Sequence, residues 1–238
     1  MLKMDNVSKT YQHRGHAVIA LDDATVHIPR GEFVSLVGPS GSGKSTLLLM
    51  LGGMLSPSNG RVLLEDQSLY EMSPNDRAGL RRQKVGFVFQ TFNLITYLSA
   101  LENVQIPLFL AGVGDEAQEE RAVSLLERVG LGDRLHHKPC ELSVGQQQRV
   151  ALARMLANDP GIILADEPTG NLDPETSRQI IGFLEEFNEE GRTIVMVTHD
   201  PRAAERAKRI LHLKDGKILD AGEEAMPAGG HARVKVRA

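Results

Sequence analysis

The sequence predicts an α/β fold: a mixed sheet with flanking helices and an antiparallel β part at the amino terminus, with an inserted α-helical subdomain. Three observations support it. Short, β-rich segments broken by turns run from Leu2 to about Gln90, and alternating strands and helices return from Gly161. Between Thr91 and Asp159 the apolar residues follow helical spacing. A glycine-rich turn from Gly38 to Ser45 stands between a predicted strand and a predicted helix.

Composition limits the classes of protein that fit. With 238 residues, 41% of them hydrophobic, the chain can bury a full core. A net charge of -4 produces no basic field, so no nucleic-acid partner is expected. The one cysteine, Cys140, cannot form an internal disulfide, and we expect a small, semi-buried residue in a reducing compartment. No signal peptide is evident, and no apolar run approaches the roughly 20 residues of a membrane-spanning helix. Any membrane role is therefore expected to come through a partner.

The core is expected over residues 1–90 and 160–220. Its predicted elements are a strand at Glu32–Val37, a helix from Lys44 toward Met54 that ends before Gly52-Gly53, strands at Arg61–Leu64, Val85–Phe89 and Ile162–Ala165, a helix from Pro174 to about Asn188, a strand at Thr193–Val197 and a hairpin at Arg209–Leu219. Asp173 and Asp200 each precede a proline, the pattern of an N-cap followed by proline at the first helical position. The hairpin is expected to turn at Asp215-Gly216.

Residues 91–159 are predicted to form the inserted helical subdomain. Ser99 and Glu102 have the spacing of a capping box. Apolar residues then recur at helical spacing before Gly130, at Val123, Leu126 and Val129. The Gly- and Ala-rich residues 221–238 show no periodicity, and we expect them to be mobile. No internal repeat is visible, so the chain contains one such unit.

The glycine-rich turn has the spacing of the Walker A motif, a loop that cradles phosphate groups. Glycine lets successive backbone N–H groups face phosphate oxygens, and the helix that begins near Lys44 directs its positive dipole end at the same anion. Lys44 supplies a point charge, and the Ser45 hydroxyl is a ligand for Mg²⁺. We therefore predict a P-loop NTPase core that binds ATP with Mg²⁺. Its predicted ATP-binding residues are Gly38, Pro39, Ser40, Gly41, Ser42, Gly43, Lys44, Ser45 and Thr46.

Two acids end the predicted strand at Ile162–Ala165, where Asp166 and Glu167 follow one another. This is the Walker B pattern, an apolar strand that ends in carboxylates. Neighbouring strand residues point to opposite faces, so the two carboxylates are expected to have different roles. We assign Asp166 to Mg²⁺, through a water molecule, and Glu167 to the general base that activates the attacking water.

The segment Leu142-Ser143-Val144-Gly145-Gln146 precedes a predicted helix from Gly145 to Ala157. Ser143 and Gln146 have capping-box spacing, which leaves amides and a hydroxyl able to face an anion, although helix capping alone also explains both residues. With the phosphate loop and the paired acids, this segment resembles the LSGGQ signature of ABC-transporter nucleotide-binding subunits, and the resemblance covers nearly the whole chain. Val144 stands where that family usually has glycine. A β-branched residue accepts a first helical position, so we expect it to tune the ATPase rate.

The resemblance implies roles for further residues. Gln90 matches the Q-loop residue that touches Mg²⁺ and senses a membrane partner. His199 matches the switch histidine that holds the γ-phosphate and the attacking water. Tyr11 lies where the family has an aromatic that stacks on adenine, with ordinary packing as the alternative. The signature residues that would contact the nucleotide of a second copy are Ser143, Val144, Gly145 and Gln146, and the D-loop between the two copies matches Asn171, Leu172 and Asp173, although Asp173 also fits an N-cap.

Longer strings resemble one branch of the family, the ATPases of lipoprotein-releasing, macrolide-exporting and cell-division systems. They are Gly86 to Gln90 with Phe92 to Leu94, Ala100 to Val104, and Ala165 to Asp173. The apolar residues between Thr91 and Leu98 either belong to the core or provide a docking surface, and we expect an integral membrane permease to dock near Gln90–Leu98.

The expected function is that of an ATP-binding and ATP-hydrolysing subunit at the cytoplasmic face of the inner membrane. Two copies would close over ATP and Mg²⁺ and move a membrane partner that exports or extracts a lipoprotein, a peptide or a drug-like substrate. The alternative is a mechanical regulator that moves a periplasmic domain and transports nothing. A DNA-repair or translation ATPase is disfavoured, because no coiled-coil insertion, zinc insertion or second unit is visible in the sequence.

Overall fold

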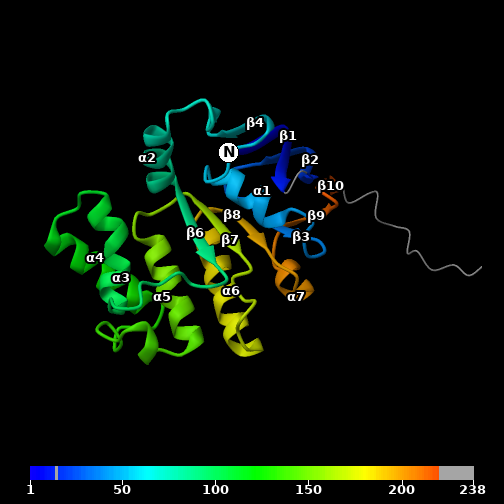
Figure 1. Cartoon of the computed structure of the whole chain (residues 1–238). Coiled ribbons are helices and arrows are strands. Elements are labelled where there is room, and N and C mark those ends of the chain that lie inside the picture. The colour runs from blue at the N-terminus through cyan, green and yellow to red at the C-terminus, as the bar shows by residue number, and fades with distance from the viewer. Residues whose placement is uncertain (14–15, 220–238) are drawn as a thin grey trace, which may run out of the picture.

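The computed structural model describes residues 1–13 and 16–219, and a mixed sheet forms its centre (Figure 1). In this described part of the chain, the sheet has six strands in the order β10-β9-β3-β8-β7-β6. Five run parallel, and β10 pairs antiparallel with β9 at one edge. The strands are β3 Phe33–Val37, β6 Val85–Phe89, β7 Ile162–Asp166, β8 Thr193–Val197, β9 Arg209–Lys214 and β10 Lys217–Leu219. The predicted strands and the turn at Asp215-Gly216 are confirmed.

Both faces of this sheet are covered, and for that reason β7 and β8 are buried along nearly their whole length. Alternate side chains enter two separate apolar clusters. The first cluster, on the side of the inserted helices, receives Phe33, Ile163, Ala165, Ile194 and Met196. The second, on the side of helix α1 Lys44–Leu51, receives Val34, Leu36, Ile162, Leu164, Val195 and Val197. Only the strand ends are left open, and loops leave the sheet there.

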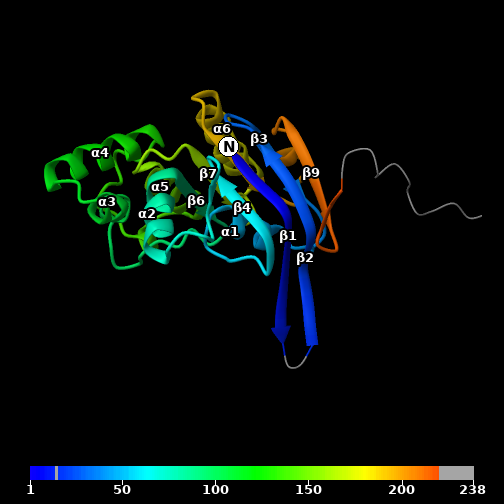
Figure 2. The same cartoon turned by 90° about the horizontal axis from the view of Figure 1, so that it is seen from above.

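A smaller antiparallel sheet covers one side of α1, with the strand order β2-β1-β4-β5. Its strands are β1 Leu2–His13, β2 His16–Ile28, β4 Asn59–Leu64 and β5 Gln67–Ser68. The prediction of only short segments here is wrong, because β1 and β2 have 12 and 13 residues and their hairpin extends past the rest of the molecule (Figure 2). In β2 the residues from His16 to Ile19 are all exposed. The outer half therefore depends on pairing with β1 and carries no apolar alternation that sequence analysis could detect.

Helix α2 Pro74–Lys84 was not predicted at all. None of its residues is buried, so it has no apolar periodicity. Local signals begin it: the Ser73 side chain accepts a hydrogen bond from the Asp76 backbone N–H, and Pro74 occupies the first helical position. Basic residues Arg81, Arg82 and Lys84 suit its carboxyl-terminal turn.

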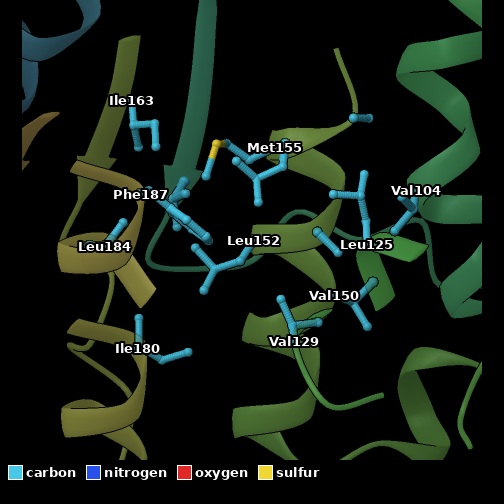
Figure 3. Packing of buried hydrophobic residues seen from close by; sticks show 14 of the residues in the cluster. Val104, Leu125, Val129, Val150, Leu152, Met155, Ile163, Ile180, Leu184 and Phe187 are labelled. Atoms are coloured by element: carbon cyan, nitrogen blue, oxygen red, sulfur yellow. The ribbon is translucent and has the colours of Figure 1, made fainter. Parts of the chain in front are cut away.

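The inserted region contains helices α3 Ala100–Leu110, α4 Asp115–Arg128 and α5 Val144–Leu156, with a short 3-10 turn, η1, at Pro139–Glu141. The predicted capping box of Ser99 and Glu102 is confirmed. Figure 3 shows Leu152 and Met155 of α5 between Phe187, on the helix that covers the sheet, and Val104 and Leu125 of the other inserted helices. Because α5 is packed on both sides, it moves as a rigid element with its neighbours.

The remaining helices begin where the sequence predicts. Asp173 caps α6 Pro174–Glu189, and Asp200 caps α7 Pro201–Ala204. Helix α1 ends at Leu51 with Gly52 as its C-cap, as the glycine pair indicates. The expectation of a mobile tail concerns residues 221–238, which lie outside the described part. Within residues 1–13 and 16–219, no helix is long and apolar enough to cross a membrane.

Candidate active site

The phosphate loop connects the end of β3 to the start of α1 and lines a cavity of about 420 Å³. Two of its glycines, Gly38 and Gly43, are required by contact as well as by backbone angle. A Cβ on Gly38 would lie 2.0 Å from the Leu213 carbonyl oxygen, and a Cβ on Gly43 would lie 2.2 Å from the Ala20 carbonyl oxygen. The residues around the cavity are Ala20, Gly38, Ser40, Gly41, Gly43, Lys44, Ser45, Thr46, Gln90, Glu167, Val197 and His199.

Lys44 is held against its own loop. Its Nζ donates to the carbonyl oxygens of Gly38 at 2.8 Å and Pro39 at 2.9 Å. The buried Ser42 hydroxyl has no hydrogen-bond partner in the part of the chain that the structure describes. A cation, Lys44, and the amino-terminal end of α1 thus line one cavity, and this combination fits the phosphate chain of a nucleotide.

Asp166 and Ser45, the two residues predicted to hold Mg²⁺ near the phosphate loop, contact each other. Ser45 lines the cavity, and its Oγ donates to Asp166 Oδ1 at 3.1 Å, so a hydroxyl and a carboxylate lie side by side. Burial raises the pKa of Asp166, while the Ser45 hydrogen bond and the Lys44 charge oppose that rise. Two neighbouring oxygen ligands fit Mg²⁺, which takes most of its remaining ligands from water and phosphate. When bound, Mg²⁺ neutralises charge on the outer phosphates.

Glu167 and His199 contact each other, although the sequence suggested only separate roles. The Glu167 Oε2 lies 2.8 Å from His199 Nδ1 and accepts from the His199 backbone N–H at 3.3 Å. An ionised carboxylate can only accept, so the hydrogen is assigned to Nδ1, which leaves Nε2 of a neutral ring as an acceptor. Glu167 also has φ +49°, a strained angle for a residue with a side chain. Glu167, the predicted general base, is therefore held in one orientation by backbone and side-chain contacts.

Gln90, which lines the cavity, and Asn171 form a reciprocal hydrogen-bonded pair. The Asn171 Nδ2 donates to the Gln90 carbonyl oxygen at 3.1 Å, and the Gln90 Nε2 donates to the Asn171 Oδ1 at 3.4 Å. Leu172 is half-buried against the first cluster. Asp173 accepts from the backbone N–H groups of Glu175 and Thr176, so its N-cap role is confirmed. The Q-loop and D-loop candidates thus touch each other within one chain.

The signature segment lies elsewhere. None of Ser143, Val144, Gly145 and Gln146 lines the phosphate-loop cavity. The predicted capping box is confirmed, because Gln146 N–H donates to Ser143 Oγ at 3.2 Å and Ser143 N–H donates to Gln146 Oε1 at 2.8 Å. Both Ser143 and Val144 are exposed, so the amino-terminal end of α5 is open to solvent and lies outside the cavity lining.

A family model described as ABC transporter matches residues 21–170, which is more than half of the chain. The chain belongs to the ABC transporter family. It is similar to an uncharacterized ABC transporter ATP-binding protein of Thermotoga maritima, 47% identical over 92% of this chain and 93% of the relative. It is also 47% identical, over 96% of its length, to the macrolide export ATP-binding/permease protein MacB of Hyphomonas neptunium, but it spans only 36% of that relative.

A solved dimeric structure of the ATP-binding cassette MJ0796, bound to ADP and Pi after hydrolysis, is 45% identical to this ABC transporter chain. It matches with a TM-score of 0.86 over 92% of this chain and 96% of the other. The likeness confirms the P-loop NTPase fold and the class of ATPase that the phosphate loop and paired acids predict. The branch expected from the longer strings agrees with the MacB relatives.

Side-chain packing shows which position of the signature segment requires glycine. A Cβ on Gly145 would lie 2.5 Å from Thr176 Cγ2 at the start of α6. Val144, in contrast, has its side chain 47% exposed. Close packing of α5 against α6 therefore requires glycine at position 145, while position 144 accepts a branched residue.

The structure also bears on the expectations for Tyr11 and Cys140. Tyr11 is 40% exposed on the β1–β2 hairpin, with Lys9 Nζ 5.2 Å from its ring centroid, and it does not line the cavity, so adenine stacking stays a prediction. Cys140 is exposed in η1, so the expectation of a semi-buried residue is wrong. Ala20 and Val197 also line the cavity. The sequence analysis did not identify them, because their aliphatic side chains carry no polar or charged group.

The close approach of α5 and α6 makes a testable prediction. Gly145→Ala should lower ATPase activity at least about tenfold, because the added methyl forces the signature end of α5 away from α6. Thr176→Ser removes the methyl that this added group would meet but keeps the hydroxyl that donates to Asp173 Oδ2. Steady-state ATPase assays should show that the double variant recovers most of the activity. Equal loss in the single and double variants would contradict this account of Gly145.

Proposed function

We propose that two copies of this chain close head to tail over two ATP molecules and that closure and reopening drive a membrane partner. The observation that carries the proposal is the separation within one chain. Residues of the phosphate loop, Glu167 and His199 line the cavity, while the exposed, capped end of α5 does not. A second copy turned about a two-fold axis brings that end of α5 to the first copy's phosphates. The solved relatives are described as dimeric, which supports this arrangement.

Hydrolysis in the closed dimer is assigned to the Glu167–His199 pair. Glu167 removes a proton from the attacking water, and the His199 ring, fixed through Nδ1, has its Nε2 available to accept a hydrogen bond from the same water. Lys44 and the loop amides hold charge on the phosphates, so positioning and electrostatics supply most of the rate. Tyr11 is proposed to stack on adenine, and Asn171, with its hydrogen bonds to Gln90, to report closure to the Q-loop.

The base assignment is tested by Glu167→Gln. The variant should bind ATP normally and accumulate as a closed dimer, while hydrolysis falls about 10²–10⁴-fold. Gel filtration with ATP and a phosphate-release assay measure the two effects. Glu175→Gln, an exposed change in the first turn of α6, is the matched control and should behave like the wild-type chain. Unchanged turnover in Glu167→Gln would remove Glu167 as the base.

The membrane partner is proposed to dock in a groove of about 350 Å³ between α2, β6, α3 and α5. The groove lies beside the expected Gln90–Leu98 segment and has no lining residue from it. The groove carries apolar surface, since Met54 and Leu110 are both more than half exposed and Phe87, Phe89 and Ile106 continue its wall. An exposed apolar groove on a chain of this family fits an amphipathic segment of a permease.

The charges of the groove indicate what the docking segment carries. Arg81, Arg82 and Arg154 all line it and donate to the backbone carbonyl oxygens of Gly53, Leu110 and, for Arg154, both Phe92 and Asn93. None of the three forms an ion pair with a carboxylate in residues 1–13 and 16–219. An apolar wall with unpaired guanidinium groups fits a short amphipathic helix that bears Asp or Glu.

Arg154 also connects this groove to the Q-loop. Phe92 and Asn93 have φ of +55° and +51°, angles that strain residues with side chains, and Arg154 donates to each of their carbonyl oxygens at 2.6 Å. Burial lowers the pKa of the Arg154 guanidinium, and no acid relieves it within the described residues. A carboxylate that enters the groove would therefore change the contacts of the residue that holds the Q-loop turn.

The docking proposal predicts the result of a charge reversal. A tagged full-length chain should co-purify from detergent-solubilised membranes with an integral membrane protein that has an acidic amphipathic cytoplasmic helix. Arg82→Glu should lose that protein, because the reversed charge repels the acidic helix. Arg178→Glu, on the exposed face of α6, should keep it. Retention by both variants, or a partner without such a helix, would contradict the proposal, and thermal unfolding scans check that both variants fold.

The process that the complex drives and its class of substrate are proposed from the names of the relatives. Several are macrolide export ATP-binding/permease proteins, so export or extraction of a drug-like, lipoprotein or peptide substrate at the cytoplasmic face of the inner membrane is favoured. A mechanical regulator without a transported substrate is the alternative. Both use the same ATPase, and the membrane protein that co-purifies distinguishes them by whether its membrane part carries substrate.

A further inference from the structure

Gln148 is a fully buried polar residue in the middle of α5, and neither the phosphate loop nor the signature uses it. Its Nε2 donates to the Pro168 carbonyl oxygen at 2.7 Å. Its Oε1 has no hydrogen-bond partner in the described part of the chain. A buried amide oxygen without a partner lowers stability, and methionine, with the same length, would avoid that cost.

The orientation of the amide is set by what it contacts. If the nitrogen and oxygen exchanged places, the amide oxygen would face the Pro168 carbonyl oxygen, and two acceptors would meet. The observed orientation therefore leaves Oε1 without a partner but preserves the hydrogen bond from Nε2 to Pro168. A bond retained at such a cost indicates a role for the group that receives it.

That group belongs to the turn that carries the base. Pro168 follows Glu167, whose φ of +49° is strained. Two backbone hydrogen bonds hold this turn. Glu167 N–H donates to the carbonyl oxygen of Val197, at the end of β8, at 3.0 Å, and Gly170 N–H donates to the Glu167 carbonyl oxygen at 3.1 Å. The Gln148 bond comes from outside the sheet and fixes the carbonyl of the residue directly after the base.

We infer that Gln148 is a positioning residue for Glu167, which it holds in its strained backbone conformation through Pro168. The inference rests on the proposed role of Glu167 as the base. Gln148 lies on the same rigid helix whose first residue follows Ser143, and the contact of Gly145 with Thr176 ties that helix to α6 as well. The segment that serves one ATP site thereby holds the base of the other site.

Gln148→Met in the full-length chain is the direct test. It keeps the length of the side chain, removes the donor to Pro168 and removes the orphan oxygen. We expect kcat for ATP to fall about tenfold, with the KM for ATP and the melting temperature not worsened. In a Glu167→Gln background, ATP-driven dimer formation should be unchanged. A purely structural role predicts the opposite, a lower melting temperature and weaker dimers with little effect on kcat in the folded fraction.

Gln147→Met is the matched control on the same helix. Gln147 is half-buried, and its Nε2 donates to the carbonyl oxygens of Pro139 and Leu142, next to the signature. This variant should weaken ATP-driven dimer formation and raise KM, with kcat at saturating ATP within about twofold of the wild type. Equal loss of kcat in both variants would assign the effect to the helix as a whole and overturn the inference.

The result that overturns the inference most simply is a Gln148→Met chain with kcat within about twofold of the wild type. Should that variant fail to fold, Gln148→Leu replaces it in the same assays. If Glu167→Gln hydrolyses normally, the base assignment itself fails. If Glu167→Gln is inactive and Gln148→Met turns over normally, only the role of Gln148 is wrong.

Discussion

The pairing of β3, β8 and β7 is the interaction on which the rest of the site depends. Leu36 pairs with Val197, and Val197 pairs with Asp166, so three parallel strands end at the same edge of the sheet. The phosphate loop, the paired acids and His199 each follow one of these ends. Their chemistry is brought together by backbone hydrogen bonds between apolar strands that are buried on both faces, and no residue of the site has to hold the fold together itself.

A second constraint is the position of α5. It is packed between α6 and the other inserted helices, its exposed start carries Ser143, and its buried side contacts the turn after Glu167. Further along, Arg154 holds two strained residues of the Q-loop. One helix thus follows the exposed Ser143, contacts the residue after Glu167, the proposed base, and lines the groove proposed for the partner. A rigid connection between these three sites is what the proposed coupling of nucleotide binding to motion of a membrane partner requires.

Much of this arrangement could be predicted from the sequence. The strands were recognised because burial on both faces leaves continuous apolar runs, and the helix starts because Ser99, Ser143, Asp173 and Asp200 carry local capping signals. Helix α2 and the outer half of the β1–β2 hairpin were missed, since neither buries an apolar face. The contact of Glu167 with His199, the crowding of Gly145 and the bond from Gln148 to Pro168 depend on long-range geometry. No spacing along the chain encodes them.

The central claim is that each ATP site is completed by a second copy, and mixing two inactive variants tests it most directly. Lys44→Ala damages the phosphate loop, and Ser143→Arg blocks the signature, so each variant alone should be inactive. In a mixed dimer one site receives both defects and the other receives none. An equal mixture should therefore recover about a quarter of wild-type ATPase activity, because half of random pairs are mixed and each has one intact site. A mixture as inactive as its parents would mean that each chain completes its own site, contrary to this account.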